Sequence, residues 1–408
     1  MMALQATLQH HPLLRATLRS GWRERWSFSG DMLPALRWRE GETGGLLPQA
    51  EEIDLRREAG LKVYVVQDRS TVDVTFQFHH ACCDGAGIDR FTDDLMVHYA
   101  GLREFGKSYK FVPTVDPNRL AVRGAYGLSF FRTLKRLPGQ LVGLMGAAQF
   151  WGRQPIPLLA HQARDRCTKS TKAYPALTSF LLDPSQTLAL RKAANHRNVT
   201  VHELLVCEFF CALWDWQKLY GQYSERHWTR MMIPINLRDA SYRSLPALNY
   251  VSSIFLDRRG DQGGDRDQLL KGIRAEMEVI KRFQLRYTFL FVLNILNGMP
   301  WALKRSVQQD TCKTSVIFSS AGKTTRRCPL PRRDGFLHVA DLVLRDIDGL
   351  APLRPYNCVT MFTLEYANRL KLNLHYDAEF VSEKQSDVLM DLFVAGLNQV
   401  ADTAGTQL

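Results

Sequence analysis

The sequence contains no hydrophobic run long enough to cross a membrane. An apolar segment at residues 289–296 is much shorter than the ~20 residues that a spanning helix needs, and Arg286 and Lys304 flank it. No positively charged and then apolar leader follows Met1, so no secretory signal is expected. These absences predict a cytoplasmic protein without a transmembrane segment.

Regular cysteine patterns are missing as well. The eight cysteines, at positions 82, 83, 167, 207, 211, 312, 328 and 358, have neither the spacing of a disulfide framework nor that of a zinc site. Potential metal ligands do crowd residues 79–84, but neighbours on a strand point apart and no second ligand cluster follows. We therefore expect reduced thiols and no metal ion.

No motif of a DNA- or RNA-binding protein appears, although the chain is basic. Its 53 Lys and Arg residues outnumber 41 Asp and Glu residues, which gives a formal net charge of +12. This charge would suit nucleic acid, anionic lipid, an acidic carrier protein or a phosphorylated cofactor equally. Without a motif, we expect no nucleic-acid partner.

The most informative segment combines two histidines with an Asp-Gly turn. Residues 72–80 alternate apolar and polar residues at the period of a half-buried strand, which places His80 on the buried face and His79 on the other. Asp84 and Gly85 then form a turn before an amphipathic helix. A neutral imidazole at such a junction accepts a proton near neutral pH, so His80 is predicted to be a general base. The alternative is an ordinary core histidine, with Asp84 serving only as a helix cap.

Residues 79–85, of sequence HHACCDG, resemble the HHxxxDG signature of a large acyltransferase superfamily. It includes chloramphenicol acetyltransferase, nonribosomal peptide condensation domains, wax ester synthases and polyketide-associated acyltransferases. The resemblance implies that the second histidine, His80, faces the reaction. It also implies that His79, Asp84 and Gly85 organise the site.

A second segment, residues 231–238, resembles the strand of this superfamily that ends in Pro-x-Asn-Leu-Arg. The resemblance implies an ion pair between Arg238 and Asp84, whereas Arg238 taken alone would be interpreted as a solvated surface charge. Asn249, in Leu248-Asn249-Tyr250, resembles the Gly-Asn step of the superfamily without its glycine.

Ser319 and Ser320 lie in a third segment, residues 316–322, which is similar to the superfamily's Val-Ser-Asn-Leu-Gly segment. The resemblance implies that they and Asn249 contact an oxyanion or the substrate; one lost oxyanion donor typically lowers the rate about a hundredfold. The alternative is a plain polar turn. The loop that follows carries Lys323, Arg326 and Arg327, which suit the phosphates of coenzyme A or an acidic carrier protein, unless the loop is merely solvated.

The order of expected elements predicts an α/β fold of two halves with mixed sheets and flanking helices. Because the 408 residues exceed one core, we expect domains at 1–165, with the histidine motif, and 175–408, with Arg238 and the two serines, joined by a polar linker at 163–172. The superfamily resemblance implies a pseudo-dimer with a cleft or tunnel between the halves. It also implies a strand and a helix before Leu4, so the sequence is expected to begin partway through the superfamily's order of secondary-structure elements.

Several local patterns predict particular elements of this fold. Asp183-Pro184 and the segment Thr200 to Glu203 predict the starts of two helices, and residues 360–366 and 370–376 predict a strand pair joined through Asn368. The other histidine pair, His10-His11, lacks an Asp-Gly and is interpreted as a helix end before Pro12. The Gly-rich residues 260–264 predict a surface loop. A basic and apolar stretch at 126–151 is interpreted as core or tunnel packing, with peripheral membrane contact as the alternative.

The combined hypothesis is an acyltransferase of lipid or secondary metabolism. It would move an acyl group from an acyl-CoA or a carrier-protein phosphopantetheine thioester, used as a co-substrate, to a small alcohol or amine. Direct transfer needs no nucleophile, so Cys82 and Cys83 are discounted, and no permanently bound cofactor is expected. O-acyl transfer is preferred over N-acyl transfer because no adjoining carrier or adenylation segment is present. The alternatives are an amide-forming condensation enzyme and a catalytically silent binding protein on the same fold.

Overall fold

A computed structural model of the chain describes most of the 408 residues. The described residues are 1–21, 24–28, 32–45, 47–110, 115–120, 139, 142–143, 145–159, 175–220, 223–238, 244–297, 299, 301, 312–354 and 356–405. The predicted linker at 163–172 lies outside them, as does the first part of the basic and apolar stretch, residues 126–136. Both predictions therefore stay predictions.

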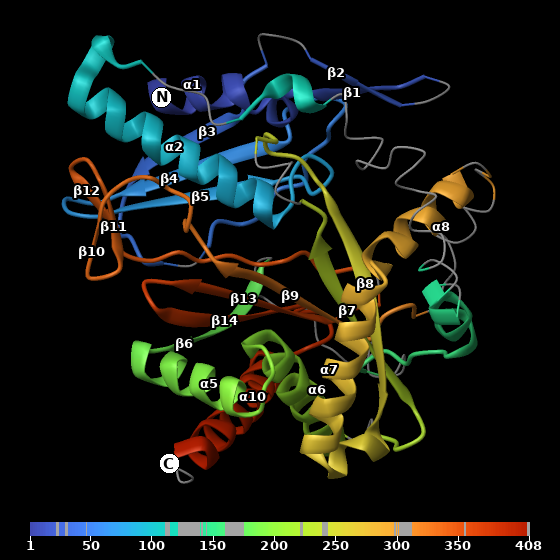
Figure 1. Cartoon of the computed structure of the whole chain (residues 1–408). Helices are drawn as coiled ribbons and strands as arrows, with labels where there is room; N and C mark the ends of the chain where they lie inside the picture. The colour runs from blue at the N-terminus through green and yellow to red at the C-terminus, as the bar shows by residue number, and fades with distance from the viewer. Residues whose placement is uncertain are drawn as a thin grey trace. The chain divides into compact units, whose positions relative to one another are not determined.

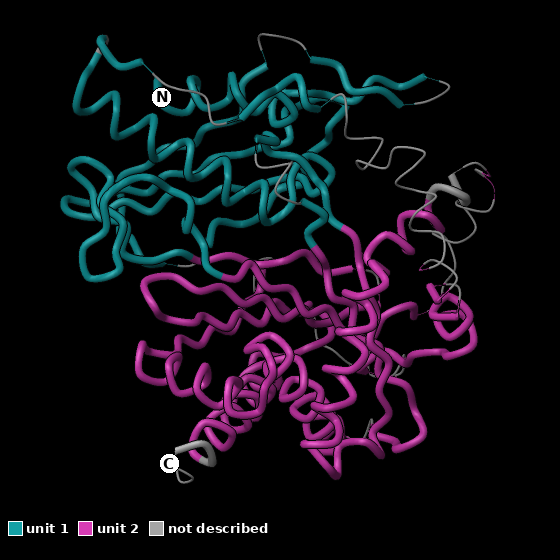
Figure 2. Tube along the Cα trace, viewed as in Figure 1, with its two compact units in different colours: residues 1–127, 236–251, 323–347 teal, residues 128–235, 252–322, 348–408 magenta. Residues whose placement is uncertain are grey.

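Contacts divide the chain into two compact units that are not continuous in sequence (Figure 2). Unit 1 comprises residues 1–127, 236–251 and 323–347, and unit 2 comprises residues 128–235, 252–322 and 348–408. Residues 236–251 and 323–347 were expected in the second half but pack in unit 1. Amino-acid composition does not show to which unit a segment belongs, because a segment has an ordinary globular composition whichever of the two cores it packs against.

Unit 1 contains a three-stranded sheet in the order β3-β4-β5, with β3 parallel and β5 antiparallel to the central β4. Its elements are α1 (Met2–His10), η1 (Pro12–Arg15), β1 (Thr17–Arg19), β2 (Arg25–Ser27), β3 (Ala35–Glu40), β4 (Leu61–Gln67), β5 (Val72–Phe78), α2 (Gly85–Phe105), η2 (Gly106–Ser108), β10 (Arg332–Arg333), β11 (Phe336–Val339) and β12 (Leu342–Leu344). Its main core joins Leu4 and Leu8 of α1, Phe91 of α2 and Val63 of β4. Burial of this apolar surface packs α1 and α2 on the sheet (Figure 1).

Unit 2 is built on a six-stranded sheet in the order β6-β14-β13-β9-β7-β8. Its elements are β6 (Ala176–Leu182), α5 (Pro184–His196), α6 (Val201–Leu219), β7 (Trp228–Asn236), β8 (Val251–Arg259), η5 (Gly260–Gly264), α7 (Arg266–Arg282), η6 (Leu285–Tyr287), α8 (Thr288–Asn297), β9 (Val316–Lys323), β13 (Val359–Tyr366), β14 (Arg369–Tyr376) and α10 (Glu383–Gly405). The pair β7–β9 is parallel and β13–β14 is antiparallel, so the sheet is mixed. Figure 1 shows α5, α6 and α10 grouped on one face of it. The α/β fold class is confirmed.

The local patterns explain where the elements of unit 2 begin and turn. The Asp183 and Thr200 side chains accept hydrogen bonds from the N–H groups of Gln186 and Glu203, which gives both predicted helix starts. The predicted pair β13–β14 turns at Ala367 and Asn368, whose φ angles are 49° and 61°. Asparagine tolerates this left-handed conformation, which a tight hairpin requires.

Two predictions from sequence had different outcomes. The glycine-rich segment 260–264 lies at the surface as expected, with Asp261, Gln262 and Gly264 exposed, but it forms a 3-10 helix and not a loop, and its Gly260 is buried against Tyr223. A Cβ atom at residue 260 would lie 2.6 Å from the Tyr223 ring, so glycine is needed for close approach and not for a loop. As expected, the structure contains no helix, among its described residues, that is long and apolar enough to span a membrane.

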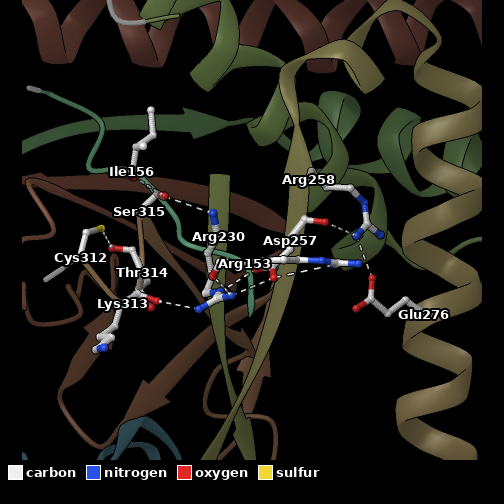
Figure 3. A network of polar contacts seen from close by, with 10 residues as sticks. All are labelled: Arg153, Ile156, Arg230, Asp257, Arg258, Glu276, Cys312, Lys313, Thr314 and Ser315. Atoms are coloured by element: carbon white, nitrogen blue, oxygen red, sulfur yellow. Dashed lines mark hydrogen bonds and ion pairs between the residues drawn. The ribbon is translucent and has the colours of Figure 1, made fainter. Parts of the chain in front are cut away.

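A buried ion pair joins neighbouring strands of unit 2 (Figure 3). The Arg230 guanidinium on β7 donates through Nε and Nη2 to the two carboxylate oxygens of Asp257 on β8, at 2.6 and 2.9 Å. Its remaining donors reach the carbonyls of Lys313 and Arg153. The guanidinium therefore connects β7, β8, and the chain segments at residues 153 and 313.

Candidate functional site

The two histidines of the motif lie in a turn just after β5. The strand ends at Phe78, and the turn is closed by the His79 N–H donating to the Gly60 carbonyl and the Cys82 N–H donating to the His79 carbonyl. His79 is half-buried and His80 is exposed. The prediction that His80 shares the buried face of the strand is wrong, because the alternation stops when the strand ends.

Among the described residues, one main-chain contact orients the His80 imidazole. Its Nδ1 lies 3.0 Å from the carbonyl oxygen of Cys83. Because a carbonyl only accepts hydrogen bonds, the neutral ring carries its proton on Nδ1, which leaves a lone pair on Nε2. An exposed imidazole held in this tautomer has the arrangement that a general base needs.

His79 has the opposite arrangement. The Ala81 N–H donates to its Nδ1 at 3.2 Å, so this nitrogen is an acceptor in the neutral ring. Burial lowers the pKa of His79 below that of an ordinary imidazole, which favours the neutral form further. Only one histidine of the pair is thus both exposed and oriented through a donating Nδ1.

The adjacent thiols have the properties of packing residues. Cys82 and Cys83 are buried in the core of unit 1 and, like the other cysteines of the described residues, are not disulfide-bonded. Burial raises the pKa of the Cys83 thiol well above its usual value. A thiol in this state is a poor nucleophile, which supports the expectation of direct transfer.

Asp84 both caps α2 and binds two other segments of unit 1. Its Oδ1 accepts from the Gly87 N–H at 2.8 Å, as an N-cap does. Its Oδ2 accepts from Arg238 Nη1 at 2.8 Å and from the Tyr250 N–H at 2.7 Å. The capping role and the ion pair implied by the resemblance are therefore both present in one carboxylate.

Arg238 is not a solvated surface charge, since its side chain is only 12% exposed. Its Nη1 donates to Asp84 and to Asn236 Oδ1, and its Nη2 donates to the Leu248 carbonyl at 2.8 Å. The same carbonyl accepts from the Asp84 N–H. Arg238 thus connects the motif turn with residues 236–238 and 248, all within unit 1.

Asn249 contacts the main chain of the general-base candidate. Its Nδ2 donates to the His80 carbonyl oxygen at 2.8 Å. The contact fixes the backbone from which the imidazole projects, which is a positioning function. A role of Asn249 in binding an oxyanion or substrate stays a prediction.

The first turn of α2 contains one glycine whose role was predicted from the sequence, Gly85, and one that was overlooked, Gly87. Around Gly85 there is open space, with no atom within 4 Å of a Cβ built there. At Gly87 a Cβ would lie 2.8 Å from Cys83 Sγ and 3.0 Å from the Leu248 carbonyl oxygen. Gly87 is therefore needed where α2 approaches the segment at residue 248. The spacing Asp84-x-x-Gly87 carries no signal of this crowding.

The other predicted site residues lie on β9 and in the loop that follows it. Ser319 and Ser320 are strand residues of unit 2, and not parts of a polar turn; Ser320 Oγ accepts from the Gly322 N–H. Lys323, Arg326 and Arg327 are exposed residues of unit 1. Their loop is attached to α2 through the Thr325 N–H, which donates to Asp89 at 2.7 Å. Their roles toward a substrate stay predictions.

Comparison with solved structures identifies the fold. The polyketide synthase associated protein 5 from Mycobacterium tuberculosis is 14% identical, with a TM-score of 0.64 over 98% of this chain and 90% of that chain. The first condensation domain of the calcium-dependent antibiotic synthetase, in complex with a substrate analogue, is 14% identical, with a TM-score of 0.65 over 98% of this chain and 86% of that chain. This chain has the condensation-domain fold.

The epimerization domain of tyrocidine synthetase B shares the condensation-domain fold with this chain, at a TM-score of 0.60, 13% identity and coverage of 98% and 88%. No family model and no curated protein matches the sequence. At these identities the similarity lies in the fold. The fold implied by the resemblance of residues 79–85 is confirmed at that level.

Proposed function

We propose that the protein is an acyltransferase in which His80 is the general base. The observation that carries this proposal is the contact between His80 Nδ1 and the Cys83 carbonyl, which leaves Nε2 unprotonated on an exposed ring. The donor is a thioester of coenzyme A or of a carrier protein, and the acceptor is a small alcohol or amine.

In the proposed reaction the acyl group passes directly from the thioester to the acceptor, without a covalent enzyme intermediate. His80 Nε2 takes the proton of the acceptor hydroxyl. At the same time the hydroxyl oxygen attacks the thioester carbonyl, which forms a tetrahedral oxyanion. The oxyanion collapses, the C–S bond breaks, and the thiolate takes the proton from Nε2. During the step the Cys83 carbonyl accepts from Nδ1–H and stabilises the imidazolium. Ser319, Ser320 and Asn249 are the proposed oxyanion donors.

The hydrogen-bonded frame around His80 serves this chemistry by restricting the motif turn. Asp84 and Arg238 join the turn to residues 236–238 and 248, and Asn249 holds the His80 main chain. A base held in place needs no reorganisation when the acceptor arrives, which is a large part of the advantage of an enzyme site. Lys323, Arg326 and Arg327 are the proposed contacts of donor phosphates or of an acidic carrier.

The deciding experiment measures free-thiol release from acyl-CoA donors of increasing length, with alcohol and amine acceptors. We expect acceptor-dependent release by the wild type and a loss of roughly 10²- to 10⁴-fold in His80→Ala. His79→Ala is the matched control, because it removes the neighbouring imidazole and is expected to have a smaller effect on kcat. Equal rates for His80→Ala and wild type would exclude His80 as the base.

Amide formation is the second candidate, because solved structures with this fold include a condensation domain of the calcium-dependent antibiotic synthetase and part of a nonribosomal peptide synthetase. The same assay separates the two candidates when donors are also presented on a phosphopantetheinyl carrier protein. Amine-dependent release from the carrier alone would establish the condensation reaction. Binding of acyl-CoA without release from any donor would instead indicate a catalytically silent binding protein.

A further inference from the structure

His11 belongs to the other histidine pair, which the sequence identifies only as a helix end. In unit 1 this residue follows α1 directly and is completely buried, with an exposed fraction of 0%. Both ring nitrogens have partners. The Ala247 N–H donates to Nδ1 at 2.8 Å, and Nε2 lies 3.1 Å from Asp94 Oδ2 on α2.

These partners define the protonation state of the ring. A main-chain N–H only donates, so Nδ1 is an acceptor and the neutral ring carries its proton on Nε2. This proton is donated to the Asp94 carboxylate, which thereby orients the ring, as carboxylates do for many functional histidines. Burial lowers the pKa of His11, in keeping with a neutral imidazole. The charged and titratable groups around it are Asp94, Arg90 and His98 of α2 and His10 of α1.

Ala247 is the first residue of a short segment that organises the motif turn. The next carbonyl, of Leu248, accepts from Arg238 and from the Asp84 N–H. Asn249 then donates to the His80 carbonyl, and the Tyr250 N–H donates to Asp84. Each residue from 248 to 250 therefore contacts the turn or its arginine, whereas Ala247 contacts His11.

We infer that His11 is a positioning residue, which uses the Ala247 N–H to hold segment 247–250 against the turn that carries His80 and Asp84. The hydrogen bond from the Ala247 N–H to His11 lies within unit 1 and does not depend on what the protein catalyses. Its consequence for the rate rests on the proposed acyl transfer. Asp94 contributes to the same positioning, because its hydrogen bond to Nε2 orients the His11 ring with Nδ1 toward segment 247–250.

The kinetic test compares three variants at saturating donor and acceptor. His11→Leu removes the acceptor for the Ala247 N–H, so we expect kcat to fall about 10- to 100-fold, with the KM of the donor within about threefold of wild type. His11→Asn restores an acceptor oxygen close to the position of Nδ1 and is expected to recover kcat to within about fivefold of wild type. His10→Gln changes the neighbouring histidine and is the matched control, with kcat unchanged.

A purely structural role would not produce this recovery together with an unchanged KM. Wild-type kcat in a folded His11→Leu variant would overturn the inference, as would a His11→Asn variant as slow as His11→Leu. Thermal unfolding of all three variants shows whether each chain is folded under the assay conditions.

A second measurement needs neither turnover nor a stable variant. In the wild-type chain labelled with ¹⁵N-histidine, long-range proton–nitrogen spectra report which ring nitrogen carries the proton. We expect His11 to be protonated on Nε2 and His80 on Nδ1. A His11 ring protonated on Nδ1 would overturn the inference even if the enzyme turns over. The expected tautomers in a chain without turnover would retain the link from His11 to Ala247 and reject only the acyl-transfer proposal.

Discussion

Each unit contains a buried pair of one arginine and one aspartate, and the two pairs are built differently. In unit 2 both carboxylate oxygens of Asp257 bind the guanidinium of Arg230 on the neighbouring strand. In unit 1 Asp84 divides its oxygens among Arg238 and the N–H groups of Gly87 and Tyr250. The first pair joins regular strands, whereas the second joins irregular segments around an exposed histidine. Residue type alone therefore does not tell a sheet contact from a site organiser; the partners do.

The largest expected effect is the loss of stability when the Arg230–Asp257 pair of unit 2 is broken. Arg230→Leu would leave the buried Asp257 with only its longer ion pair to Arg153, at 3.8 Å, so the free energy of unfolding should fall by about 3–5 kcal/mol. Denaturant unfolding measures the change. The double variant Arg230→Leu/Asp257→Leu removes both charges and should recover most of the loss. A single variant as stable as wild type would contradict a structural role for this pair.

Breaking the pair of unit 1 should act mainly on catalysis. Arg238→Lys keeps the charge, but an ammonium lacks the fork that reaches Asp84 and the Leu248 carbonyl together. We expect kcat to fall about a hundredfold, since positioning errors of about 1 Å can have this effect. The control is Arg230→Lys, which should lower stability and leave the kcat of the folded enzyme unchanged. Equal kinetic effects of the two lysine variants would remove the distinction between the pairs.

Asp93 tests the opposite case, a buried carboxyl whose Oδ1 has no hydrogen-bond partner among the described residues. Burial, reinforced by the charge of Asp89, raises the pKa of Asp93 to about 8. The folded chain therefore retains a proton that the unfolded chain releases above about pH 4, and stability falls as the pH rises from there to about 8. Asp93→Asn removes this dependence and should stabilise the protein by about 4 kcal/mol more at pH 8.5 than at pH 5. Equal stability gains at the two pH values would refute the assignment.

The smallest expected change in stability concerns a single helix cap. Thr200 caps α6 in unit 2 as Asp84 caps α2 in unit 1, but Thr200 makes no contact with the motif turn in the described structure. Thr200→Ala should lower the free energy of unfolding by about 1 kcal/mol and leave the kcat of the folded enzyme unchanged. The comparison variant is Asp84→Ser, which retains a cap but loses the carboxylate and should be nearly inactive. Chemical denaturation and thiol-release rates check both results, and an active Asp84→Ser variant would make Asp84 a cap alone.

Much of the site could be anticipated from side chains with a distinctive spacing. The motif at 79–85 and the end of segment 231–238 led to the ion pair between Asp84 and Arg238, which the structure contains. The contributions of Ala247, Leu248 and Tyr250 could not be anticipated, because main-chain groups are the same at every residue. His11 was interpreted as a helix end for a related reason: its partner lies 236 residues away.

The sequence by itself determined the elements that depend on near neighbours. These include the helix starts at Asp183 and Thr200 and the hairpin turn at Ala367 and Asn368, where caps and left-handed conformations act within a few residues. Only the tertiary structure decided that residues 236–251 and 323–347 pack in unit 1, that His80 is exposed, and which nitrogen of its ring is free. Those outcomes depend on contacts between distant segments. Because the hydrophobic effect is non-directional, the periodic pattern of a segment shows which of its faces is buried but not which distant segment covers that face.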